Sequence, residues 1–357
     1  MRVIRLRGTP YEMGVQHGRE LKELIHALAA ERLEIACQFA GERGVFPTRD
    51  DCLELAARHL PFHQEYSSDV LDELRGIADG AELLLEEVFF ANALTDFQDV
   101  LWQSAGVEVH GCTSFVVGGD ATDEGGPYIG QTWDMHASAE QFIMLFRREP
   151  ADGPTSLTMT TAGCLSLVGV NDAGVAAGNN NLRPTDARPG VIYLAMLHQA
   201  LRQTDWNRAR RAITDADRAS GHNYYLAHES GARCNIETTA TRSSETEIAT
   251  PWYVHTNHYL SPDLQSLEDP ELDRRSTEHR LRRATERFRD NTEALTPERL
   301  RQLLSDHDGD ELCICRHGEG REARSCAFVV ADPVQRCLWT SLGPPCEGSL
   351  QRFSLAN

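Results

Sequence analysis

The 357-residue sequence contains a single lysine, Lys22, and no GxxxxGK[ST] segment. Enzymes that bind pyridoxal phosphate as a Schiff base need a reactive lysine, and P-loop nucleotide-binding proteins need that segment. Basic residues are scarce as well, because 35 lysines and arginines stand against 54 acidic residues, for a formal net charge of −19. That charge repels nucleic acid and anionic lipid, so we expect neither as a main partner.

Long hydrophobic runs are also missing from the sequence. No run approaches the ~18 apolar residues of a membrane-spanning helix, and the N-terminal stretch MRVIRLRGTPYEMG has no apolar core of the secretory type. We therefore expect a soluble cytoplasmic protein with no membrane partner. The ten cysteines are too dispersed for a small disulfide scaffold.

The cysteine pattern also argues against a metal site. Cys313 and Cys315 form a CxC pair, but no second Cys/His pair follows at finger-like spacing. We expect no zinc there, no other metal, and mostly reduced thiols in the core.

Residues 1–111 show a mainly helical pattern. Thr9-Pro10-Tyr11-Glu12 is a capping box with proline at the first helical position, which predicts a helix start. Gly14 and Gly18 follow one turn apart and would let another backbone approach the helix closely, with helix–sheet packing as the simpler expectation. Further helices are predicted over 51–60, 67–79 and 82–100, with an interruption at Pro61.

From Cys112 onward the pattern changes to strands separated by turn-forming residues. An arginine-rich helix is predicted over 273–290, where a solvated face is the simpler interpretation and a docking surface for an anionic acyl carrier is the alternative. Helices flanking many antiparallel strands indicate a layered α+β body with one sheet packed on another. Strands are predicted over 113–119, 128–134, 142–148, 156–162, 167–171, 174–179, 223–228, 232–238, 245–249, 252–257, 325–331 and 336–342, and helices over 193–216 and from Thr296.

The pair Gly111-Cys112 stands at the start of the first of these strands. If the bond between them is cut, Cys112 carries a thiol and a free α-amine, and an amine with an ordinary pKa of about 7.7–8.0 can accept the thiol proton. Gly111 leaves the preceding carbonyl unshielded and tolerates unusual backbone dihedrals. On this pair alone, a buried structural cysteine is the simpler alternative.

A longer pattern favours the catalytic interpretation. The run GCTSFVVGGD…GPYIGQTWDMH resembles the isopenicillin-N acyltransferase-like family of self-processing N-terminal-nucleophile (Ntn) amidohydrolases and acyltransferases. The resemblance extends in family order through GTPYEMGVQHG, DELRGIADGAE, VGVNDAGVAAGNNNL, HTNH and ICRHGEGREAR. It implies an αββα four-layer Ntn fold. It also implies a precursor cut into fragments 1–111 and 112–357, which stay associated as a heterodimer and together form one αββα domain.

The resemblance also implies roles for individual residues. Cys112 is the expected nucleophile, with the cut between Gly111 and Cys112. Asp134 is expected to accept a hydrogen bond from the Cys112 ammonium, with a plain turn acid as the alternative. Asn257 matches the family's oxyanion asparagine, a donor type whose loss raises the barrier by roughly 3–4 kcal/mol. Arg324 is expected to pair with Asp134.

Three further residues are expected to contribute to substrate binding: Asn180, His136 and His222. For Asn180 a structural turn role remains open. Ala323 stands where the penicillin-biosynthetic member has a serine, which weakens the acyltransferase version of the function.

The expected activity is hydrolysis of a small N-acyl or aminoacyl-amine compound through an acyl-thioester on Cys112, with no cofactor. The alternative is acyl transfer from an acyl-CoA or an amide to an amine such as a 6-aminopenicillanic acid-like acceptor. A third hypothesis, an Ntn-fold protein that binds ligand without turnover, predicts an uncut chain and no thioester.

Overall fold

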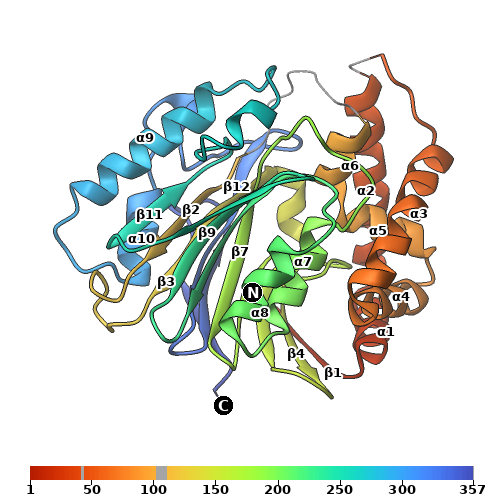
Figure 1. The fold of residues 1–357 in the computed structure, drawn as a ribbon, viewed down its shortest axis with the longest axis horizontal. Helices are drawn as coiled ribbons and strands as arrows, with labels where there is room; N and C mark the ends of the chain where they lie inside the picture. Colours follow the sequence, from red (N-terminus) through yellow and green to blue (C-terminus); the bar gives the residue numbers. More distant parts are fainter. Residues whose placement is uncertain (42–43, 102–110, 357) are drawn as a thin grey trace.

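The computed structural model describes residues 1–41, 44–101 and 111–356, and its elements form four layers (Figure 1). Two sheets pack face to face, and helices cover the outer face of each. Because both faces of the central strands are covered, a strand such as β5 (Ser156–Thr161) is buried at every position. The layer order is the αββα sandwich that the resemblance implies.

The larger sheet has the strand order β1-β4-β5-β6-β7-β8-β9-β10 within the described residues. Its edge strand β1 pairs parallel with β4, and every other neighbouring pair is antiparallel. The remaining bounds are β1 (Val3–Gly8), β4 (Ile143–Pro150), β6 (Val168–Asn171), β7 (Val175–Asn181), β8 (His222–His228), β9 (Arg233–Thr238) and β10 (Ser243–Glu247).

The smaller sheet has the order β11-β2-β3-β12-β13-β14 and is antiparallel throughout its described part. Its central strands β2 and β3 pack against β7 and β8 of the larger sheet, so the two sheets share one apolar core. The bounds are β2 (Thr113–Val117), β3 (Tyr128–His136), β11 (Trp252–His255), β12 (Ala323–Asp332), β13 (Cys337–Leu342) and β14 (Gln351–Ser354).

The helices divide between the two outer layers, as Figure 1 shows. The layer on the larger sheet consists of α1 (Pro10–Glu20), α2 (Lys22–Gly41), α3 (Arg49–Tyr66), α4 (Ser68–Ala81), α5 (Leu85–Asn92), α6 (Leu94–Leu101), α7 (Tyr193–Leu201) and α8 (Trp206–Thr214). The smaller sheet is covered by α9 (Arg275–Arg289) and α10 (Pro297–Leu304). Across the described ranges, no helix is both long enough and apolar enough to cross a bilayer.

The predicted start of α1 is confirmed. The Thr9 hydroxyl accepts from the Glu12 N–H at 3.3 Å, and the Glu12 carboxylate accepts from the Thr9 N–H at 2.8 Å. At Gly14 and Gly18 another backbone does approach α1 closely, but the simpler expectation of helix–sheet packing is wrong, because the neighbour is a helix. A Cβ atom at Gly14 would lie 2.2 Å from the Glu73 carbonyl oxygen of α4, and one at Gly18 would lie 2.4 Å from that of Ile77.

One local prediction is wrong, and two strands were missed. Helix α3 continues through Pro61. Pro61 is solvent-exposed, so the carbonyl that its missing N–H leaves unpaired can be hydrated. The strands β1 and β14 were not predicted, and β1 joins the N-terminal segment to the larger sheet.

Candidate active site

Cys112 lies at the entry to β2, between the two sheets. Thr113 pairs with Thr132 of β3, and its N–H donates to the Thr132 hydroxyl at 3.2 Å. Side chains alternate along a strand, so Cys112 shares the inner face with Ser114, which donates to Asn180 of β7 at 3.0 Å. The Cys112 side chain is only 7% exposed.

Asn257 follows β11 and lies against the peptide group that precedes Cys112. Its backbone N–H donates to the Thr277 hydroxyl at 2.7 Å, and its Nδ2 donates to the Asn181 carbonyl at 2.9 Å. Its Oδ1 accepts from Arg280 at 3.0 Å. The amide is therefore fixed in orientation, and the second hydrogen on Nδ2 remains available to a nearby oxygen.

Arg280 of α9 joins Asn257 to the backbone of Cys112. Its Nη1 donates to the Cys112 carbonyl at 2.6 Å and to the Thr113 hydroxyl at 3.2 Å. Burial lowers the pKa of Arg280 to about 10, which still leaves the guanidinium charged at neutral pH. The interpretation of residues 273–290 as a purely solvated face missed this residue. A signal was present, since Thr277, Arg280 and Ala284 follow the helical spacing of the buried stripe.

Gly111 is packed tightly between these two side chains. A Cβ atom there would lie 2.1 Å from Arg280 Nη2 and 2.5 Å from Asn257 Oδ1. The requirement for glycine at this position thus comes from its neighbours, since Gly111 is not one of the described glycines with positive φ.

We expect Gly111→Ala to slow or abolish separation of the chain into fragments 1–111 and 112–357. The added methyl group would displace Asn257 or Arg280 from the Gly111 peptide group. Denaturing electrophoresis over a time course after purification measures the effect. Gly41→Ala, at the last residue of α2, is the control, because a Cβ atom there would lie no closer than 3.4 Å to the Phe46 ring. Cleavage of Gly111→Ala at the wild-type rate would contradict the assignment.

Asp134 of β3 is fully buried on the side of the sheet that faces Arg280 and Arg316. Within the described part of the chain, neither carboxylate oxygen has a hydrogen-bond partner, although the hydroxyls of Thr132 and Ser325 lie nearby. Burial raises the pKa of Asp134, and the charges of Arg316 and Arg280 oppose that effect. Unused acceptors on a buried carboxylate suit a cationic donor such as an α-ammonium at residue 112.

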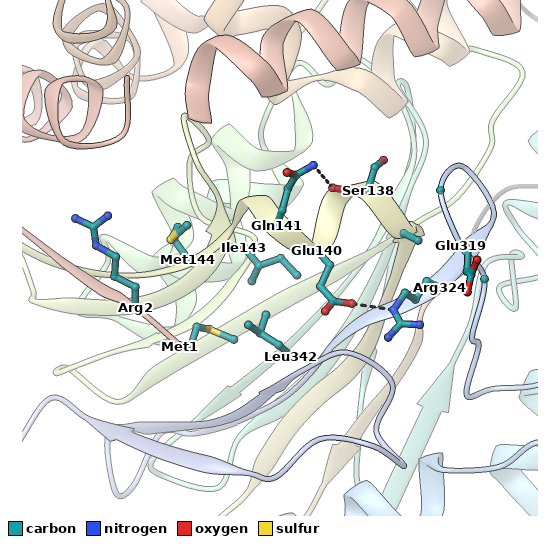
Figure 2. A pocket seen from close by; sticks show the side chains of 13 residues that line it. Met1, Arg2, Ser138, Glu140, Gln141, Ile143, Met144, Glu319, Arg324 and Leu342 are labelled. Carbon is teal, nitrogen blue, oxygen red and sulfur yellow. Dashed lines mark hydrogen bonds and ion pairs between the residues drawn. The ribbon is translucent and has the colours of Figure 1, made fainter. Parts of the chain in front are cut away.

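The predicted partner of Asp134 is wrong. Arg324 pairs with Glu140 at 2.8 Å and with Glu347 at 3.3 Å. It lies on the wall of a surface pocket of about 680 Å³, its guanidinium directed at Glu140 (Figure 2). The strand register explains this, since Ser325 stands opposite Asp134 and Arg324 opposite Met135, so Arg324 points to the other face.

Arg316 occupies the position expected of Arg324. Its Nε lies 3.9 Å from Asp134 Oδ2, and both side chains are almost fully buried. It precedes β12, and its N–H donates to the Ser325 hydroxyl at 3.1 Å. Arg316 stands in the ICR segment, so that segment already contained the correct arginine.

The thiol environment keeps Cys112 protonated in the folded chain. Burial raises the pKa of Cys112 to about 12, and the Asp134 charge acts in the same direction. The N–H of Asp134 and the guanidinium groups of Arg280 and Arg316 oppose the shift only in part. A nucleophilic role therefore needs a base at the site.

The three residues expected to bind substrate lie in different environments. Asn180 is buried between the sheets and accepts from Asn223 at 3.0 Å as well as from Ser114. His222 is buried, and its ring stacks on Tyr193 with centroids 4.3 Å apart. His136, at the end of β3, contacts the Arg321 carbonyl through Nδ1 at 2.8 Å. Their roles in binding stay predictions.

Arg32 of α2 is a buried cation that the sequence did not single out. Arg32 is 5% exposed, and no hydrogen bond or ion pair connects its guanidinium with another described residue. Its charge acts on Tyr193, Cys164 and His136. Tyr193 is in turn within electrostatic reach of Cys112.

The architecture defines the class of fold. A conjugated bile acid hydrolase variant from Clostridium perfringens superposes with a TM-score of 0.50 at 10% identity, covering 68% of this chain and 92% of that one. Together with two antiparallel sheets between helical layers, this similarity identifies the Ntn-hydrolase αββα sandwich.

Sequence comparison gives the family. Residues 121–347 match the family model of acyl-coenzyme A:6-aminopenicillanic acid acyl-transferase, and the chain belongs to that family. The chain is similar to the 40 kDa form of acyl-coenzyme A:6-aminopenicillanic-acid-acyltransferase from Emericella nidulans, with 29% identity over 95% of this chain and 91% of the relative. An uncharacterized protein from Archaeoglobus fulgidus is 24% identical over 55% of this chain and 35% of its own length. The chain is thus an enzyme of an acyl-transferring family, as predicted.

Proposed function

We propose that this protein is a self-processing cysteine amidohydrolase that cleaves the amide bond of a small N-acyl compound. The observation that carries the proposal is the convergence of Gly111, Asn257, Arg280 and Asp134 on Cys112. These groups supply a scissile carbonyl, an amide donor, a fixed cation and a buried carboxylate around one thiol.

Self-processing begins with the Cys112 thiol and the Gly111 carbonyl, which belong to adjacent residues. The sulfur adds to the carbonyl carbon, the C–N bond breaks, and the Cys112 nitrogen takes up a proton and leaves as an amine. Water then hydrolyses the thioester and releases the Gly111 carboxylate. Asn257 and Arg280 lie next to Gly111, where they can stabilise the negative charge that develops on its oxygen.

Turnover uses the same groups with the substrate amide in place of the Gly111 peptide. The free amine of Cys112 accepts the thiol proton, the thiolate attacks the amide carbon, and the protonated amine gives its proton to the leaving nitrogen. Water hydrolyses the resulting thioester. Asp134, which Arg316 holds in place, orients the ammonium through its unused acceptor oxygens.

The fragments are expected to remain associated after the cut. The segment 1–101 contributes β1 to the larger sheet and six helices to the outer layer, including the described contacts of α1 with β1 and β4. Its apolar side chains belong to the same core as those of the second fragment. We also propose a cytoplasmic location, because the ten cysteines are free thiols, as is usual for reducing compartments.

The test is an assay of freshly purified enzyme on a panel of N-acyl amines, followed by mass spectrometry of both products. We expect the wild type to release free acid and free amine. The Cys112→Ala variant should release neither product. An uncut wild-type chain that binds these amides without product would support a binding protein and overturn the proposal.

Acyl transfer is the second candidate function, and the Emericella nidulans relative favours it by its name. The same acyl-thioester can react with an amine instead of water. Incubation with an acyl-CoA and a 6-aminopenicillanic acid-like amine separates the two functions. A new amide product assigns transfer, and formation of free acid alone assigns hydrolysis.

Arg32 indicates the substrate class within this proposed function. We infer that it binds a carboxylate on the acyl or the amine part, because a buried guanidinium without a carboxylate partner among described residues suits an anionic ligand.

We expect Arg32→Met to raise KM for a carboxylate-bearing amide by about 10- to 100-fold, the equivalent of one charged hydrogen bond. The neutral analogue of that amide should be hydrolysed as by the wild type. Arg58→Met, at an exposed position of α3, is the matched control. An equal change of KM for the charged and the neutral amide would contradict carboxylate binding by Arg32. It would leave the proposed amidase function intact.

A further inference from the structure

Four metal-ligating side chains from three separate segments meet at the surface beside the start of β12. His307 lies in the loop after α10, Cys315 and His317 precede β12, and Cys346 lies between β13 and β14. Their ligand atoms all lie within 4.8 Å of one another.

His317 is the centre of the cluster. Its Nε2 lies 3.1 Å from His307 Nε2, 3.6 Å from Cys315 Sγ and 3.3 Å from Cys346 Sγ. One ring nitrogen has one lone pair or one hydrogen, so it cannot serve three partners at once. A single cation between the four atoms can.

The distances fit zinc. With Zn–S bonds of about 2.3 Å and Zn–N bonds of about 2.0–2.1 Å, the edges of a tetrahedral site measure roughly 3.3–3.8 Å. The contacts of His317 Nε2, between 3.1 and 3.6 Å, need only small adjustments to reach that range. Two thiols and two imidazoles select a soft or borderline cation such as Zn²⁺ over Ca²⁺ or Mg²⁺.

The outer contacts of His317 are also those of a metal ligand. Its Nδ1 lies 2.9 Å from a Glu347 carboxylate oxygen, so Nδ1 carries the hydrogen and Nε2 keeps its lone pair. A carboxylate behind a ligating histidine fixes the ring and makes it a stronger donor. Glu347 is held in turn by Arg324 at 3.3 Å, which gives Arg324 a role that differs from the predicted one.

We propose that His307, Cys315, His317 and Cys346 bind one Zn²⁺ in a closed structural site. Binding releases the two thiol protons, and the charge of two thiolates balances that of the ion. The sequence argued against zinc because the CxC pair lacks finger-like partners. The structure instead combines Cys315 with the nearby His317 and with His307 and Cys346 from two other segments. The Cys313 thiol stays outside the cluster and donates to the Cys315 carbonyl at 3.1 Å.

The site acts on the candidate active site through Arg316. This arginine stands between two of the ligands in sequence, and its guanidinium lies 3.9 Å from Asp134. A metal ion that fixes both flanking residues to two other loops therefore positions Arg316 against the buried carboxylate.

The test is metal analysis of the full-length protein purified with a non-chelating reductant, followed by cobalt substitution. We expect one zinc per chain in the wild type, and after exchange the absorption of tetrahedral Co²⁺ with thiolate ligands. Cys346→Ser and His307→Ala, both at exposed positions, should lose the zinc and change that spectrum. Cys37 is not part of the cluster, so Cys37→Ser should keep both the zinc and the wild-type Co²⁺ spectrum.

Chelation should lower the melting temperature of the wild type and leave that of Cys346→Ser unchanged, since a ligand that binds only the folded state stabilises it. Three results would overturn the proposal. They are metal-free wild type that takes up no added Zn²⁺, a Co²⁺ spectrum unaffected by Cys346→Ser, and a disulfide between Cys315 and Cys346 in the reduced preparation.

Discussion

Replacement of Cys112 by alanine is expected to leave one uncut polypeptide of 39.8 kDa with no amidase activity. In the proposed mechanism the change removes the sulfur that attacks Gly111, and without the cut there is no α-amine to serve as base. Loss of the nucleophile in comparable covalent mechanisms costs on the order of 10⁶ in turnover. Intact-protein mass spectrometry and an amide-hydrolysis assay measure the two effects.

The fold of the variant should be unaffected, because the change removes a single heavy atom, the sulfur, from a buried position. Far-UV circular dichroism checks this. Cys37→Ala is the matched control, since its thiol contacts the Pro47 carbonyl and interacts with Cys52 of α3, and it should be cut and active. Normal fragments from Cys112→Ala would show that another group makes the cut.

Replacement of Asn257 by aspartate is expected to lower turnover by about 10²- to 10³-fold with little change in KM. Aspartate keeps the oxygen that accepts from Arg280 but removes Nδ2, whose second hydrogen is the donor that the proposed mechanism assigns to the developing oxyanion. The same donor serves Gly111, so the self-cleavage rate should fall as well. Turnover is therefore measured per cut chain, with the cut fraction taken from denaturing gels.

Asn207→Asp is the control for this change, because Asn207 is an exposed residue of α8. This variant should cut its own chain and turn over substrate at the wild-type rates. If Asn257→Asp raised KM with unchanged turnover, Asn257 would contact the bound substrate without stabilising the transition state.

Much of the fold follows from local sequence. The capping box at Thr9 and the turn-forming residues between the strands determine local geometry without help from distant residues, so their elements were predicted correctly. The strand β1 was missed although Ile4 and Leu6 alternate with arginines, a pattern typical of a half-buried strand. The exposed strand β14 offers no such pattern.

Those residues of the candidate site that belong to a single strand or a single sequence motif could be predicted from the sequence. Cys112 immediately precedes β2, Asp134 lies on its partner strand β3, and Asn257 follows β11, which pairs with β2 on the other side. The choice between Arg316 and Arg324 depends on the register of β12, including a bulge between Ser325 and Ala327, which no local pattern determines. The position of Arg280 beside Cys112 likewise depends on how α9 packs on the sheet, which no local pattern determines.

The cysteine–histidine cluster was the least predictable feature. Its ligands span residues 307 to 346 and meet only because three loops converge beside β12. Spacing rules identify sites built on one short motif, and they give no information on ligands that tertiary structure brings together.

The central claim is that Cys112 acts through its own thiol and its own liberated amine. Rapid acid quench of the wild type during turnover, followed by peptide mapping of the larger fragment, tests it most directly. We predict a fragment that begins at Cys112, with a free α-amine and a hydroxylamine-labile acyl group on that sulfur. An acyl group on a different residue, or a fragment that begins elsewhere, would contradict the account.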